Sequence, residues 1–148
     1  MKTITNLAAA LLGFIFTVIG LNYFFQFFAM PAPPADSPPA AFLGAMIASG
    51  YFGVVKALEV IGGILVAVPR TRALGLLILG PIVVNILLFN IFLAKGAGFF
   101  PLPAAVVGLS LFLLWTERAA FARLMPQRSP ARPASSTSGA AQHAQNAY

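Results

Sequence analysis

The sequence predicts an all-α integral membrane protein that folds as a four-helix transmembrane bundle, and three observations support this class. Of its 148 residues, 59% are hydrophobic and only 8% are charged. The mean hydropathy is +0.90, which lies outside the range of ordinary water-soluble domains. The apolar residues fall into four long runs, separated by segments rich in proline, arginine or glycine. Successive runs of this kind are typical of helices that cross a bilayer.

The first predicted helix covers about residues 4–28. It is long enough to cross a hydrocarbon core of roughly 30 Å at 1.5 Å per residue. The run is too long for the apolar region of a signal peptide, and no small-residue cleavage site precedes the prolines that follow it, so we expect an uncleaved helix. Ala9, Gly13 and Thr17 form a row of small residues that favours close packing of another helix.

The second predicted helix covers residues 41–68, which is longer than one span requires. Two interpretations fit this length: a single tilted helix, or a short lead-in helix that breaks near Ser49-Gly50 or Gly53 before the span. The prolines of residues 30–40 prevent helix continuation and predict an exposed loop before it. Small residues recur at every fourth position and favour close helix packing: Ala41, Ala45, Ser49, Gly53 and Ala57.

The third and fourth predicted helices cover residues 73–94 and 102–120. Gly80-Pro81 lies inside the third helix and is expected to kink it, because proline cannot donate a backbone hydrogen bond. These helices complete a predicted membrane domain at residues 1–121. Residues 122–148 are rich in Pro, Ser, Ala and Gln without hydrophobic periodicity, which predicts a disordered tail.

The basic residues predict the orientation of the bundle. Lys95 alone falls beside the spans on one side, and the remaining lysines and arginines near the spans fall on the other. By the positive-inside rule, both termini and the tail face the cytoplasm. The net charge of +6 is therefore explained by membrane topology, and we expect no nucleic-acid partner. The residues on the cytoplasmic side are Lys2, Arg70, Arg72, Arg118, Arg123, Arg128 and Arg132.

Five polar residues lie at depth in three of the predicted helices and form the candidate ligand-binding pocket: Asn22, Lys56, Glu59, Asn85 and Asn90. Lys56 and Glu59 share one face of the second helix, because residues three apart are neighbours on a helix. Ionisable groups inside a membrane are costly and usually functional. The structural alternative stays open: an ion pair that joins helices, with asparagines as interhelical hydrogen-bond partners.

The residue types present also limit the chemistry. The chain has no cysteine, and its one histidine, His143, lies in the tail. No ligand set for a metal, a haem or a flavin is evident, so we do not expect catalysis by this chain alone.

The chain resembles the DoxX-like family of small four-helix bacterial membrane proteins. The resemblance covers about residues 4–120 and depends on Gly13-Phe-Ile-Phe-Thr-Val-Ile-Gly-Leu-Asn22, Lys56-Ala-Leu-Glu-Val-Ile-Gly-Gly63 and Pro81-Ile-Val-Val-Asn-Ile-Leu-Leu-Phe89, together with Phe42-Leu-Gly-Ala and Ser49-Gly-Tyr51. It implies a multi-pass protein of the bacterial cytoplasmic (inner) membrane. It also implies a link to quinone-dependent oxidation or to membrane oxidoreductase complexes.

Three functions remain open at this point. The first is a redox-associated membrane subunit whose polar pocket holds a quinone-like or other small amphipathic molecule. The second is a small-solute or proton-coupled transporter, which at this size would require a homo-oligomer. The third is a non-catalytic structural subunit of a membrane complex, in which Lys56 and Glu59 only lock the helix packing. The expected partners are the lipid bilayer and, for the first and third functions, another membrane subunit.

Overall fold

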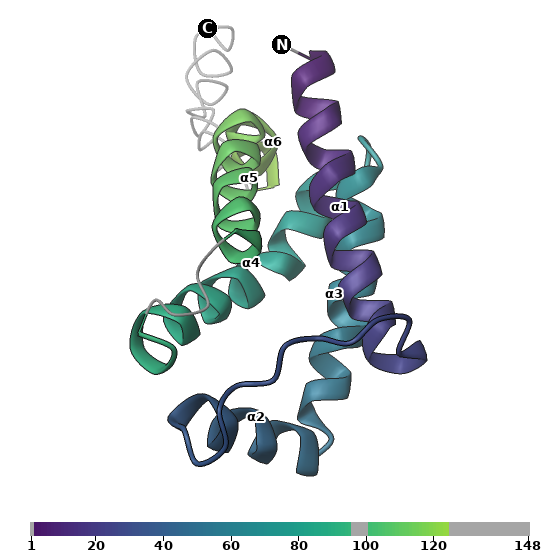
Figure 1. Ribbon diagram of the computed structural model, residues 1–148. Helices are drawn as coiled ribbons and strands as arrows, with labels where there is room; N and C mark the ends of the chain where they lie inside the picture. Colours follow the sequence, from purple (N-terminus) through teal and green to yellow (C-terminus); the bar gives the residue numbers. More distant parts are fainter. Residues whose placement is uncertain (1, 96–100, 125–148) are drawn as a thin grey trace, which may run out of the picture.

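A computed structural model describes residues 2–95 and 101–124, and the regular structure in these two ranges is entirely helical. The elements are α1 (Lys2–Phe25), α2 (Pro38–Ala48), α3 (Tyr51–Ala67), α4 (Arg72–Leu88), the π-helical turn η1 (Phe89–Leu93), α5 (Leu102–Thr116) and α6 (Arg118–Leu124). Helices α1 and α3 run side by side, α4 slants away from them, and α2 lies across the far end of α3 (Figure 1).

The helices indicate a membrane protein. Two of them, α1 and the continuous segment Arg72–Leu93, are long and apolar enough to cross a membrane, and α2 with α3 would make a third span if counted together. Helix α5 is apolar but shorter than a full span. Large apolar side chains cover the outer surfaces of these helices, with Phe14 65%, Leu74 50% and Trp115 70% exposed. Such a surface suits contact with lipid and would be unusual in water.

The second predicted helix is two helices. Helices α2 and α3 meet at an angle of 87° across a two-residue break, where Gly50 adopts a left-handed backbone conformation with φ of 75°. Glycine adopts this conformation at little cost. The lead-in interpretation is therefore confirmed at Ser49-Gly50, and the single helix over 41–68 is wrong. The predicted row of small residues from Ala41 to Ala57 is therefore divided between two helices that point in different directions.

Helix α2 begins at Pro38, inside the segment predicted as a loop. Pro38 and Pro39 occupy its first turn, where the backbone N–H groups have no partner inside the helix and proline is tolerated. The hydroxyl oxygen of Ser37 accepts a hydrogen bond from the backbone N–H of Ala40 at 3.3 Å. This N-cap fixes the start of the helix, so the loop ends earlier than the predicted residue 40.

Close approach between α1 and α3 depends on glycine. A Cβ atom added to Gly13 would lie 2.5 Å from the carbonyl oxygen of Gly63, and one added to Gly63 would lie 2.7 Å from Oγ1 of Thr17. A Cβ on Gly75 would likewise lie 2.5 Å from the backbone nitrogen of Val66, where α4 crosses α3. The small-residue packing predicted for α1 is confirmed at Gly13 and Thr17.

At the C-terminal end of α3, the side chain of Arg72 brings four elements together. Its side chain is buried; Nη1 lies 2.9 Å from Oε1 of Glu117, and Nη2 donates to Oδ1 of Asn6 at 2.8 Å. Nε donates to the carbonyl oxygen of Val66 at 3.4 Å. The start of α1, the end of α3, the start of α4 and the junction of α5 with α6 therefore meet at one end of the molecule.

The remaining boundaries differ by a few residues from those predicted. Helix α4 continues through Pro81, and the fourth predicted helix is divided at Glu117 into α5 and α6. Residues 122–124, placed in the predicted tail, belong to α6. The rest of that tail, residues 125–148, lies outside the described residues.

Candidate functional site

Lys56 and Glu59 form a buried ion pair one turn apart on α3. Nζ of Lys56 donates to both carboxylate oxygens of Glu59, at 2.9 Å and 2.8 Å. The lysine side chain is 13% exposed and the glutamate side chain 5%. The ammonium group also lies 5.0 Å from the centroid of the Phe52 ring, within the range of a cation–π interaction. Each charge is therefore compensated inside one helix.

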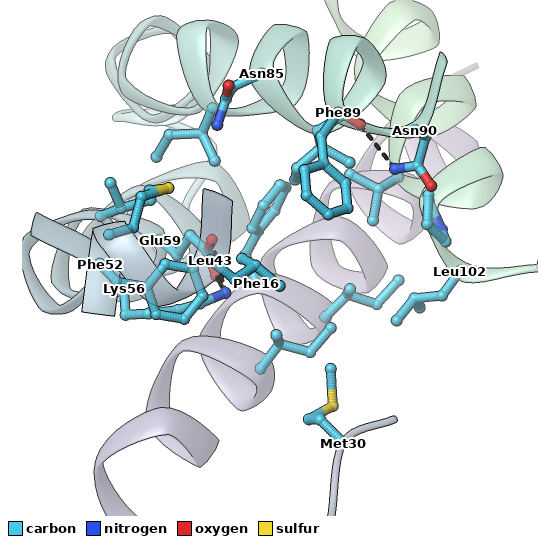
Figure 2. Close-up of a pocket in the computed structure, with 18 of the residues that line it drawn as sticks. Phe16, Met30, Leu43, Phe52, Lys56, Glu59, Asn85, Phe89, Asn90 and Leu102 are labelled. Atoms are coloured by element: carbon cyan, nitrogen blue, oxygen red, sulfur yellow. Dashed lines mark hydrogen bonds and ion pairs between the residues drawn. The ribbon is translucent and has the colours of Figure 1, made fainter. Parts of the chain in front are cut away.

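The pair forms part of the wall of a cavity of about 220 Å³. Side chains of α1, α2, α3, α4, η1 and the start of α5 line it, together with Met30 of the loop after α1. Figure 2 shows the pair on the α3 side, with Asn85 and Asn90 on the side of α4 and η1. Four of the five predicted pocket residues, Lys56, Glu59, Asn85 and Asn90, line this cavity. The other lining residues are apolar, among them Phe16, Leu43, Met46 and Phe89.

Asn90 lies at the turn where the α-helix gives way to η1. Its side-chain nitrogen donates to the carbonyl oxygen of Ile86 at 2.7 Å, and the residue is only 5% exposed. A π-helical turn carries one extra residue per turn, so it displaces the side chains that follow, and such turns are frequent at functional sites. The bond to Ile86 uses one amide N–H, and the side-chain oxygen accepts no hydrogen bond from the part of the chain that the structure describes.

Asn85 differs from Asn90, because its side chain is exposed and makes no hydrogen bond within the described residues. It lies on the edge of the cavity (Figure 2). A carboxamide offers two donors and an oxygen acceptor. In apolar surroundings, such a group is stabilised only when a partner pairs with it.

Asn22, the fifth predicted pocket residue, is not among the residues that line the cavity. Its amide nitrogen donates to the carbonyl oxygen of Phe28 at 3.0 Å, and its side-chain oxygen accepts from the backbone N–H of Phe28 at 2.9 Å. The side-chain nitrogen and oxygen together hold the chain in a turn after α1. Helix α1 therefore ends at Phe25, three residues earlier than predicted. Asn22 lines a neighbouring hollow that it shares with Tyr23 and Lys56.

The sequence did not predict that α2 would cover the cavity. Phe42, Leu43 and Met46 of α2 line it, and the Phe42 ring centroid lies 5.8 Å from that of Phe89. Their apolar character is equally typical of a membrane-spanning segment, so only the break at Ser49-Gly50 could have suggested this placement. The cavity consequently has an apolar cover at one end and a compensated ion pair in its wall.

This arrangement suits a small molecule with an uncharged polar group. The apolar wall would bury a ring or a hydrocarbon, while the ion pair and two asparagines would orient its oxygens, which is how small-molecule sites are commonly built. Within residues 2–95 and 101–124, no three His, Cys, Asp or Glu side chains cluster as a metal site would require.

Comparisons with protein-family models, with curated proteins and with solved structures find no match to this chain.

Proposed function

We propose that this chain is a DoxX-like membrane subunit that binds a quinone-like amphipathic molecule in the cavity beside Lys56 and Glu59. The observation that carries the proposal is the composition of the cavity wall, which is apolar except for Lys56, Glu59, Asn85 and Asn90. A quinone offers carbonyl oxygens for such donors and an apolar ring for such a wall. In this proposal the redox chemistry belongs to the bound molecule and to a partner oxidoreductase.

The proposed topology has four crossings of the bacterial inner membrane, made by α1, by α3 with α2 at its outer end, by Arg72–Leu93 and by α5. Both termini then face the cytoplasm. The contacts of Arg72 with Asn6 and Glu117 support this arrangement, because they hold the start of α1, the start of α4 and the end of α5 together. Labelling of single-cysteine variants with a membrane-impermeant maleimide tests it: position 6 should be protected in intact cells, and position 36 should react.

Binding of a benzoquinone with a decyl tail to the purified protein in phosphatidylcholine nanodiscs tests the proposed ligand. Lys56→Met should weaken binding about tenfold or more, because it removes the charged donor from the wall. Lys2→Met is the matched control, since it makes the same change at an exposed residue far from the cavity. Equal binding by both variants would count against the proposal.

Proton-coupled transport is the second candidate, and the observation that favours it is a titratable pair on the wall of a cavity. Proteoliposomes with an imposed pH gradient should then show flux that Glu59→Gln abolishes. Flux indifferent to Glu59→Gln, or none above protein-free vesicles, would exclude this candidate.

A further inference from the structure

A second hollow, which we call the α3–α4 groove, adjoins the cavity. Its volume is about 550 Å³, and it is lined by Tyr51 and Leu58 of α3 and by Leu77, Ile78 and Pro81 of α4, among others. The groove and the cavity share lining residues: Phe42, Met46, Val55, Ile82 and Asn85. The two spaces therefore adjoin, and Asn85 lines both of them.

The groove lies on the outer surface of the helices. Tyr51 is 60%, Leu58 39% and Leu77 60% exposed. Toward the end that carries Arg72, the crossing of α3 and α4 closes the space: a Cβ atom on Gly62 would lie 2.7 Å from the Leu79 side chain. The groove thus has a closed end and an open side along the helix surface, and it shares Asn85 with the cavity.

Its lining is apolar apart from Asn85 and the hydroxyl of Tyr51. From Leu77 to Asn85 the groove follows α4 for about 12 Å at 1.5 Å per residue. A hydrocarbon chain suits such a surface, and a polar group would suit only the Asn85 end. At that end the Asn85 carboxamide makes no hydrogen bond within the described residues.

We propose that the ligand has a single hydrocarbon tail that lies in the α3–α4 groove, and that Asn85 hydrogen-bonds an oxygen of its uncharged head group in the cavity. This inference rests on the proposed function and adds the class of ligand, its direction of approach and a residue that selects it. The molecule then enters sideways from the lipid phase between α3 and α4.

Charge and size together favour an uncharged, ring-sized head. Lys56 and Glu59 neutralise each other at 2.8 Å and 2.9 Å, so the wall offers no net charge to an anionic head group such as a phosphate. The cavity volume of about 220 Å³ lies below the range of about 300–1,000 Å³ typical of drug-sized ligands. It is larger than an apolar cavity of about 150 Å³ that holds benzene.

Photocrosslinking in nanodiscs locates the tail. The probe is a benzoquinone whose decyl tail ends in a diazirine, and the modified peptides are mapped by mass spectrometry. Crosslinks at Leu58, Leu77 or Ile78, reduced by excess unlabelled quinone, are expected. Crosslinks at Tyr23 or Ile47 in the hollow on the α1 side would overturn the placement of the tail and leave quinone binding intact. No competed crosslink anywhere in the chain would overturn both proposals.

Two variants test the same inference by affinity. Ile78→Trp fills the groove and should weaken binding of the decyl quinone at least tenfold, while the tail-free quinone binds as to the unaltered protein. Leu74→Trp is the matched control on α4, because Leu74 is exposed and does not line the groove or the cavity. Asn85→Leu should weaken binding of both quinones about fivefold, the effect of losing one hydrogen bond. The inference would be overturned if Ile78→Trp bound the decyl quinone with unchanged affinity, or if Asn85→Leu bound both quinones with unchanged affinity.

Discussion

Arg72 and Glu117 form an ion pair, with 2.9 Å between Nη1 and Oε1, although 45 residues separate them in the chain. The guanidinium group is buried, and its remaining contacts are with Asn6 and the backbone of Val66. The sequence indicated Arg72 only as one of several basic residues that set the topology. In the fold it connects the start of α4 to three other elements.

Glu117→Gln should destabilise the protein by about 1–3 kcal/mol. The change removes the anion beside a buried guanidinium, which among residues 2–95 and 101–124 then keeps only the neutral partners Asn6 and Val66. The measurement is the apparent unfolding temperature in detergent micelles. Arg118→Gln is the control, because Arg118 is exposed and stacks on Trp115 with 4.4 Å from its guanidinium carbon to the ring centroid. A decrease in unfolding temperature for Arg118→Gln as large as that for Glu117→Gln would contradict this account.

Lys56 and Glu59 should behave differently when changed singly and together. Lys56→Met removes the only ionic partner that the buried carboxylate has among the described residues, and it should destabilise the fold by about 3–5 kcal/mol. The double variant Lys56→Met/Glu59→Met removes both charges and should recover most of that stability. Unfolding in detergent measures the stability, and quinone binding is measured on the same samples. A double variant that folds and still binds the decyl quinone would show that the pair serves packing alone.

Asn22→Ala should loosen the turn that follows α1. Two hydrogen bonds to the backbone of Phe28 are lost, at a cost of about 1–3 kcal/mol, because each contributes about 0.5–1.5 kcal/mol. Hydrogen exchange at the backbone N–H of Phe28 should accelerate by about fivefold or more. Tyr23→Phe, which keeps the aromatic ring beside Phe52, should leave this exchange unchanged.

Gly63→Ala should destabilise the contact between α1 and α3. The new Cβ atom would lie 2.7 Å from Oγ1 of Thr17 and 2.8 Å from the carbonyl oxygen of Gly13, so the helices must separate. Overpacking of this kind typically costs about 1–3 kcal/mol. Gly108→Ala in α5 meets no atom within 4 Å and should stabilise the protein by about 0.5–1 kcal/mol through helix propensity. Equal unfolding temperatures for the two variants would refute the proposed role of Gly63.

Local chemistry made several features predictable. The length and hydropathy of the apolar runs predicted the membrane class and the approximate position of each helix. The spacing of Lys56 and Glu59 predicted their contact, because residues three apart meet on any helix. The sequence placed Asn85 and Asn90 at depth in the third predicted helix, and both line the cavity.

Features that depend on distant contacts could not be read in the same way. Asn22 is polar and lies at depth, as a pocket residue would, yet its side-chain amide hydrogen-bonds the backbone of Phe28 in the turn after α1. The apolar residues of α2 suit a spanning helix as well as a cover, and the bend of 87° decides between these roles.

The sequence by itself thus determined which segments are apolar enough to leave water, where small residues allow helices to approach, and which charges neighbour each other on one helix. Each of these properties arises within a few turns of chain. The tertiary structure decided that side chains of α2 line the cavity, that Arg72 meets Asn6 and Glu117, and that Asn85 lines both the cavity and the α3–α4 groove. These contacts join residues far apart in the chain, so they exist only once the helices have packed.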